Sequence, residues 1–125
     1  MSEPVNRFHG MSLSAWEKAL PNNLNYDAEG LYSVVGGLRG GFGLRGGRLV
    51  DAVRRNVLNL LQLGARPVLG APKVSRKFWI EQLQYGSEPE QIADNLIKEW
   101  LEAGCDPDIS GVWLAIREDI DAEEF

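Results

Sequence analysis

The chain has 125 residues, a length typical of one domain, and folding would bury about two-thirds of the surface that the unfolded chain exposes. Hydrophobic residues make up 44% and charged residues 25%, which excludes a disordered chain, and no apolar run approaches the ~20 residues of a membrane-spanning helix. The first ten residues lack a basic start followed by an apolar core, which predicts no secretory signal and a cytoplasmic location. We expect residues 1–10 to form a flexible tail and residues 11–125 to form a single domain.

The net charge of −5 is distributed unevenly along the chain. Residues 39–77 carry nine lysine and arginine residues against the single acid Asp51, whereas residues 78–125 carry thirteen acids against Lys98 and Arg117. Two interpretations follow: the halves pack together and neutralise each other, or one acidic face meets a basic partner. A surface of one charge sign increases encounter rates and selects partners.

The N-terminal part predicts two helices. The tetrapeptide SAWE at 14–17 has the spacing of a capping box and predicts a helix over 13–20 that ends at Pro21. The polar run that follows predicts a turn, after which Asp27 is the expected N-cap of a second helix over 28–37. One face of that second helix carries apolar side chains at helical spacing, namely Leu31, Val34, Val35 and Leu38.

The stretch GGLRGGFGLRGG at 36–47 contains the pentapeptide Gly-Leu-Arg-Gly-Gly twice and seven of the fourteen glycines of the chain. Its Gly-x-Gly-x-x-Gly letters do not predict a dinucleotide site, because that motif follows a strand and a helix is expected here. Arg-Gly-Gly units also occur in RNA-binding segments, but in longer disordered arrays. We expect a structural role, in which glycines permit positive φ and tight bends while Leu38, Phe42 and Leu44 anchor the stretch to the core.

The middle of the chain predicts a long helix and a hairpin. Apolar residues at three- and four-residue steps predict a helix over 48–64 at the centre of the core, with Gly64 as its C-cap. The run ARPVLG at 65–70 predicts a strand, and its proline indicates an edge strand or a strand start. Alternation over 77–86 predicts a second strand that pairs with the first.

The C-terminal part begins with a second capping-box sequence, SEPE at 87–90, which predicts a helix that ends at Gly104. The run CDPDISG at 105–111 predicts a turn, and residues 112–117 predict a strand buried on both faces. Residues 118–125 form an acidic tail that we expect to be frayed, with docking of Ile120 and Phe125 as the alternative. The predicted inner face of the helix carries Ile92, Ala93, Leu96, Ile97, Trp100 and Leu101.

This order of elements predicts an α+β fold with a small, mostly antiparallel sheet of about three strands, covered on one side by helices. Three helices followed by a hairpin are also the order of a winged-helix nucleic-acid-binding domain. A recognition helix needs an exposed polar face, however, whereas residues 49–63 are apolar around most of the circumference, and a pI near 4.9 makes nucleic acid a less favoured partner. In that alternative, an anion patch would comprise Arg39, Arg45, Arg48, Arg54 and Arg55.

No residue pattern in the sequence indicates an enzyme. His9 lies in the predicted tail, and Cys105 follows a helix C-terminus, where the helix dipole disfavours a thiolate. Asp106 and Asp108 belong to ordinary turn chemistry, and the acidic tail lacks the spacing of a calcium-binding loop. We therefore expect no catalytic residues, no cofactor and no metal site.

The stretch YGSEPEQIADNLIKEWLEAGCDPDISGVWLAI at 85–116 resembles the C-terminal part of small bacterial immunity proteins of contact-dependent and other polymorphic toxin systems. The resemblance covers about a quarter of the chain and rests on the capped helix with Glu99-Trp100-Leu101, a Gly-x-Asp-Pro turn and Gly111-Val112-Trp113. It implies an acidic protein that occludes the basic active site of a cognate toxin, such as a nuclease, through charge complementarity. The expected toxin-binding residues are Glu88, Glu90, Asp94, Glu102, Asp106, Asp108, Glu118 and Asp119.

Overall fold

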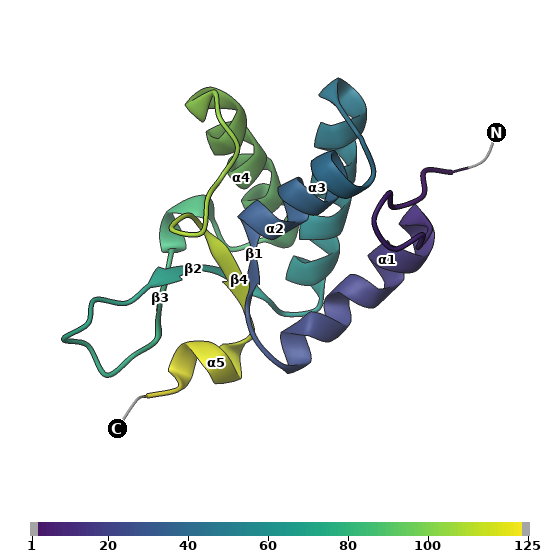
Figure 1. Cartoon of the computed structure of the whole chain (residues 1–125). Coiled ribbons are helices and arrows are strands. Elements are labelled where there is room, and N and C mark those ends of the chain that lie inside the picture. Colours follow the sequence, from purple (N-terminus) through teal and green to yellow (C-terminus); the bar gives the residue numbers. More distant parts are fainter. Residues whose placement is uncertain (1–2, 124–125) are drawn as a thin grey trace.

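Two long amphipathic helices build most of the core, because they pack against each other and against one face of a small sheet. The computed structural model describes residues 3–123. The elements in chain order are α1 (Leu13–Ala19), a 3₁₀ helix (Leu20–Asn25), β1 (Glu29–Gly30), α2 (Leu31–Gly36), a π-helical turn (Gly37–Gly41), α3 (Gly46–Gln62), β2 (Arg66–Gly70), β3 (Trp79–Glu81), a 3₁₀ turn (Leu83–Tyr85), α4 (Pro89–Ala103), β4 (Trp113–Ala115) and α5 (Arg117–Asp121). Figure 1 shows α2, α3 and α4 gathered at one side of the sheet and α5 at the opposite end of the molecule. The predicted α+β class is confirmed.

The sheet has four strands in the order β1-β4-β2-β3, and all neighbours pair antiparallel. β4 lies in the interior of the sheet and is buried on both faces, as predicted. Leu114 joins the main core, whereas Ala115 joins a smaller cluster with Val68 and Ile120 on the other face. The strand that the sequence does not predict is β1, which has only 2 residues and therefore no periodicity to detect.

Pro67 is the second residue of β2 and so lies at a strand start, the second of the two predicted alternatives; it does not mark an edge strand. β2 lies between β4 and β3, and the outer strand of the hairpin is β3. The carbonyl of Pro67 accepts the N–H of Gln82 at 2.8 Å. In an antiparallel ladder the N–H and C=O of one residue point to the same neighbour, so the missing donor of Pro67 faces Gln82, just beyond the end of β3. The proline thus costs no bond to β4.

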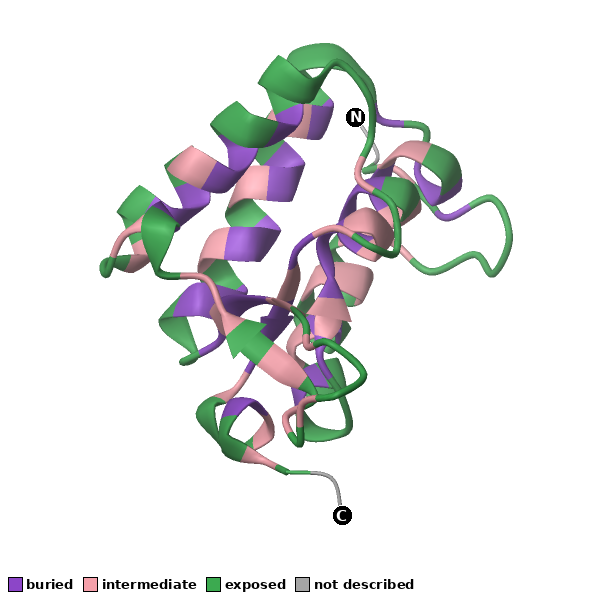
Figure 2. Cartoon of the chain, turned by 90° about the vertical axis from the view of Figure 1, so that its left-hand side faces the viewer, coloured by how far each residue is buried: buried purple, intermediate pink, exposed green. Residues whose placement is uncertain are grey.

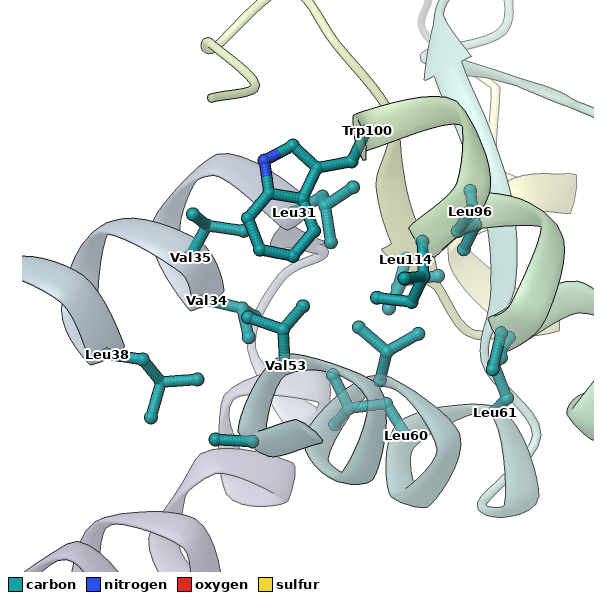
Figure 3. Packing of buried hydrophobic residues seen from close by; sticks show 14 of the residues in the cluster. Leu31, Val34, Val35, Leu38, Val53, Leu60, Leu61, Leu96, Trp100 and Leu114 are labelled. Carbon is teal, nitrogen blue, oxygen red and sulfur yellow. The ribbon is translucent and has the colours of Figure 1, made fainter. Parts of the chain in front are cut away.

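The main core confirms the two longest predicted helices. α3 inserts five large side chains between α2 and α4, namely Leu49, Val53, Val57, Leu60 and Leu61, each no more than 2% exposed. Figure 3 shows α2, α3, α4 and Leu114 of β4 converging on one apolar cluster, and Figure 2 shows buried residues along the inner sides of the helices. At about 1.5–3 kcal/mol for each buried side chain, α3 is the main contributor to this core. One inner-face residue of α4 is predicted wrongly, because Leu101 is 53% exposed.

The N-terminal segment differs from the predicted flexible tail. Residues 3–10 form a turn that rests on the π-helical turn, where the N–H of Arg7 donates to the carbonyl of Gly41 at 2.9 Å. The side chain of Asn6 is buried and its carbonyl oxygen accepts the N–H of Phe8 at 2.8 Å. The predicted capping box is also wrong, because the N-cap of α1 is Ser12. Met1 and Ser2 lie outside the described residues.

The second predicted helix begins later than expected. Glu29 and Gly30 pair with β4, and the N–H of Leu31 donates to the carbonyl of Val112 at 3.0 Å. These bonds satisfy the backbone in an extended conformation, so α2 begins at Leu31 with Gly30 as its N-cap. Asp27 instead accepts the N–H of its neighbour Ala28. The four apolar residues predicted for one face of this helix are all buried.

The glycine-rich stretch is mostly helical and is not a simple bend. Residues 36–41 continue α2 through the π-helical turn, and positive φ occurs only beyond it, at Gly43 and Gly46. The predicted role as a bent connection therefore holds for the last glycines, just before α3. Leu38, Phe42 and Leu44 are buried, so the predicted anchoring of this stretch to the core is confirmed.

The acidic C-terminal segment forms α5 over Arg117–Asp121, in place of a frayed tail. Ile120 is 5% exposed and docks in the smaller cluster, as the alternative interpretation predicts. The Nζ of Lys77 donates to the carbonyl of Asp121 at 3.0 Å, which ties the end of α5 to the hairpin. Glu124 and the predicted docking of Phe125 lie outside the described residues. Within residues 3–123, no helix combines the length and the apolar character needed to cross a membrane.

Candidate protein-binding surface

α4 separates an apolar inner face from an acidic outer face. Its inner face buries Ile92, Leu96 and Trp100 in the core. The helix begins at Pro89 with Glu88 as its N-cap, and the side chain of Glu88 makes no capping hydrogen bond, so the predicted capping box at 87–90 does not form. The left-handed conformation of Gly104 ends the helix where the sequence predicts.

The outer face of α4 and the loop that follows it form the acidic surface of the molecule. Between residues 88 and 108 the chain has seven carboxylates and one cation, Lys98. All seven carboxylates are exposed. We define the acidic surface by these residues: Glu88, Glu90, Asp94, Glu99, Glu102, Asp106 and Asp108.

Two of these carboxylates form ion pairs that join the basic and acidic halves of the chain. Nε of Arg54 lies 2.7 Å from Oδ1 of Asp94. The guanidinium of Arg39 makes two hydrogen bonds to the carboxylate of Asp106, a fork in which Nε donates to Oδ2 at 2.7 Å and Nη2 donates to Oδ1 at 2.9 Å. The interpretation that the two halves pack together is therefore correct for these pairs. It accounts for only part of the charge, since most of the acidic surface has no such partner.

Asp106 and Asp108 fix the loop between α4 and β4. The indole N–H of Trp100 donates to Oδ1 of Asp106 at 3.2 Å. The hydrogen bond from Arg39, with a smaller contribution from Trp100, lowers the pKa of Asp106. Oδ1 of Asp108 accepts from the hydroxyl of Ser110 at 2.6 Å and from its N–H at 2.9 Å, and these bonds lower the pKa of Asp108. Both carboxylates are thus held ionised and in place.

Glu99 belongs to this surface although the sequence does not single it out as a binding residue. The hydroxyl of Tyr85 donates to Oε1 of Glu99 at 2.7 Å. Tyr85 is 6% exposed, and its burial, together with this bond, raises the pKa of its phenol. Helical spacing could have identified Glu99 from the sequence, because it lies about one turn before Glu102 on the same side of α4.

Glu118 and Asp119, the remaining predicted toxin-binding residues, lie apart from the acidic surface. They occupy the first turn of α5. Figures 1 and 2 show α5 at the opposite end of the molecule from the C-terminal end of α4. Six of the eight predicted residues therefore lie on α4 or on the loop that follows it, and these two do not.

The arginines of the alternative anion patch are largely engaged with acids. Besides the pairs of Arg39 and Arg54, Arg55 makes two hydrogen bonds of 2.8 Å to the carboxylate of Glu17 on α1. Arg45 and Arg48 form no ion pair with another residue of the stretch 3–123. Three of the five arginines of this predicted patch are thus paired with acids of the same chain.

Comparison of the chain with protein-family models, with curated proteins and with solved structures found no match. In the part of the chain that the structure describes, no three histidine, cysteine, aspartate or glutamate side chains gather as metal ligands.

Proposed function

We propose that this protein is an immunity protein, which neutralises a cognate bacterial toxin by covering the basic active site of that toxin, most naturally a nuclease. The observation that carries this proposal is the acidic surface, where seven exposed carboxylates oppose one lysine between residues 88 and 108. A nuclease binds phosphates with cationic side chains, so its active site presents the complementary charge.

The internal ion pairs leave enough charge for this role. Asp94 and Asp106 bind arginines from the basic half, and Glu102 lies 4.0 Å from the Nζ of Lys98. Glu88, Glu90, Glu99 and Asp108 have no ion pair with any residue from 3 to 123. These carboxylates remain available to a basic partner.

The arrangement favours rapid and selective association. Complementary charge increases association rates from about 10⁵–10⁶ M⁻¹s⁻¹ to about 10⁸–10⁹ M⁻¹s⁻¹ at low salt. Fast capture suits an inhibitor that must reach a toxin before the toxin reaches its substrate. A rigid helix also presents its carboxylates without the entropic cost of ordering a loop.

The first experiment is a pull-down with the tagged protein from its native cells, at low and at high salt. Every retained chain is identified by mass, and the eluate is tested for nucleic acid. The proposal predicts one stoichiometric basic partner that salt releases and whose toxic activity this protein inhibits. Retained nucleic acid without a protein partner would overturn the proposal in favour of the nucleic-acid-binding alternative.

The second experiment tests the surface with matched variants. Glu88→Lys combined with Glu90→Lys reverses two charges at the start of α4, and Glu118→Lys combined with Asp119→Lys makes the same change at the start of α5. We expect the α4 variant to bind the partner about tenfold more weakly or worse, with a smaller salt dependence, and the α5 variant to bind normally. Equal affinity of both variants and the wild type would contradict the assignment.

A further inference from the structure

A cavity of about 230 Å³ opens at the C-terminal end of the acidic surface, between the start of α2, the last turns of α4 and the loop that leads to β4. Figure 3 shows two of the contributing elements, with Leu31 of α2 facing Trp100 of α4. The volume suits one large side chain and not a folded segment. The apolar walls are provided by Leu31, Leu96, Trp100, Ala103, Pro107 and Val112.

The rim of this cavity is anionic. Glu99, Asp106 and Asp108 line it, and the lining includes no lysine or arginine. Arg39 bonds both oxygens of Asp106. Oε2 of Glu99 and Oδ2 of Asp108 accept no hydrogen bond from residues 3–123. Two carboxylate oxygens therefore remain available beside an apolar wall.

This combination of wall and rim selects a particular kind of side chain. An acidic side chain would meet like charge, and a purely apolar one would desolvate the rim carboxylates without replacing their hydrogen bonds. Lysine and arginine have an apolar stem that lies along hydrocarbon and a charged end that stays with polar groups. Arginine fits separate carboxylates better, because its planar guanidinium offers five donors in different directions, whereas lysine carries a point charge.

We propose that the cavity receives one arginine side chain of the basic partner protein, with the stem against Trp100 and the guanidinium between Glu99 and Asp108. This inference rests on the proposed function and names the anchor of that interaction. Arginine is among the residue types that contribute most to the affinity of protein interfaces when the side chain fills a pocket. The remaining carboxylates of the acidic surface then guide the approach of the partner.

A cavity-filling variant tests the anchor in the complex. Ala103→Leu occupies the cavity and preserves every carboxylate, and Ala15→Leu makes the same change at an exposed position of α1. We expect Ala103→Leu to weaken partner binding at least tenfold and Ala15→Leu to leave it unchanged. Glu99→Gln preserves the shape and removes one charge, and it should weaken binding severalfold. Wild-type affinity of Ala103→Leu would overturn the inference while leaving the proposed function intact.

A direct probe tests the cavity without the partner. The indole N–H of Trp100 gives its own NMR signal and reports on the rim through its bond to Asp106. N-acetylarginine amide at millimolar concentration should shift this signal saturably in the wild type and not in Ala103→Leu. The isosteric, uncharged N-acetylcitrulline amide should have no effect, and N-acetyllysine amide a weaker one. An equal shift with citrulline, or no shift with arginine, would overturn the inference. If N-acetylarginine amide binds saturably but the pull-down finds no protein partner, that result would count against the proposed function alone.

Discussion

Gly41 lies where the N-terminal turn touches the π-helical turn, and a Cβ added there would overlap the side-chain amide of the buried Asn6. We expect Gly41→Ala to lower the free energy of unfolding by roughly 1–3 kcal/mol, the usual cost of overpacking. Gly40 is the matched control, since it is also helical and a Cβ there meets no atom within 4 Å. Gly40→Ala should be neutral or stabilising by up to about 1 kcal/mol. Urea denaturation of both variants measures the difference, and equal midpoints would contradict the packing described for Asn6.

Asp106 should make stability depend on pH in the acid range. Its pKa is lowered in the folded state, mainly by the hydrogen bond from Arg39, so the folded protein binds fewer protons than the unfolded chain. The contribution is fully present above the ordinary carboxyl pKa of about 3.9 and is lost as the pH falls through the lower native value. Asp106→Asn should therefore be destabilising at pH 7, and its difference from the wild type should shrink on acidification.

Urea denaturation of Asp106→Asn and the wild type from pH 7 down to pH 2 tests this dependence. Asp51→Asn provides the control for net charge, because Asp51 is exposed and forms no ion pair with residues 3–123. A difference between Asp106→Asn and the wild type that stays constant over the whole range would mean that the fork with Arg39 contributes nothing to folding. The test applies to one residue and does not depend on any partner.

α5 contributes one buried side chain to the sheet, in addition to its bond with Lys77 and the ion pair of Arg117 with Glu81. Ile120 is 5% exposed and packs with Ala28, Val68 and Ala115. We expect Ile120→Ala to lower the free energy of unfolding by about 2 kcal/mol, the lower end of the range for such truncations, because the cluster is small. Amide exchange over α5 should become faster at the same time. Ile109→Ala is the control, since Ile109 is 67% exposed. Fast amide exchange over α5 in the wild type itself would indicate that α5 is frayed.

The elements that the sequence predicts well are those whose own residues determine them. α3 and α4 appear where predicted because their long apolar stripes have helical periodicity. α4 ends at the predicted Gly104, whereas α3 ends at Gln62 with Leu63 as its C-cap, one residue before the predicted Gly64. The sequence does not predict β1 or the late start of α2, because both depend on pairing with β4, which lies more than eighty residues away along the chain. Neither predicted capping box forms: the side chain of Ser12 caps α1, and Glu88 is the N-cap of α4 without a side-chain hydrogen bond.

The acidic surface is predictable in composition and only partly in geometry. Helical spacing correctly groups Glu88, Glu90, Asp94 and Glu102 on the outer face of α4. No local pattern shows that Asp106 bonds Arg39, which is 67 residues away, because tertiary packing brings them together. The position of α5 at the far end of the molecule is equally invisible in the sequence, so Glu118 and Asp119 appeared to belong to the same surface.

The distribution of charge over the whole molecule, and not the net charge of −5, should control association with a basic partner. Exchanging the members of the ion pair between Arg54 and Asp94, by Arg54→Asp with Asp94→Arg, conserves the net charge and the pair but places a cation on α4. We expect an unchanged unfolding midpoint and a slower association, because the arginine on α4 repels the incoming partner. The control exchanges Arg117 with Glu81, a pair at the far end of the molecule. Stopped-flow association rates measured from low to high salt should separate the two, since the difference must vanish as salt screens the charges. If both exchanges slow association equally, or neither does, the partner does not approach through α4.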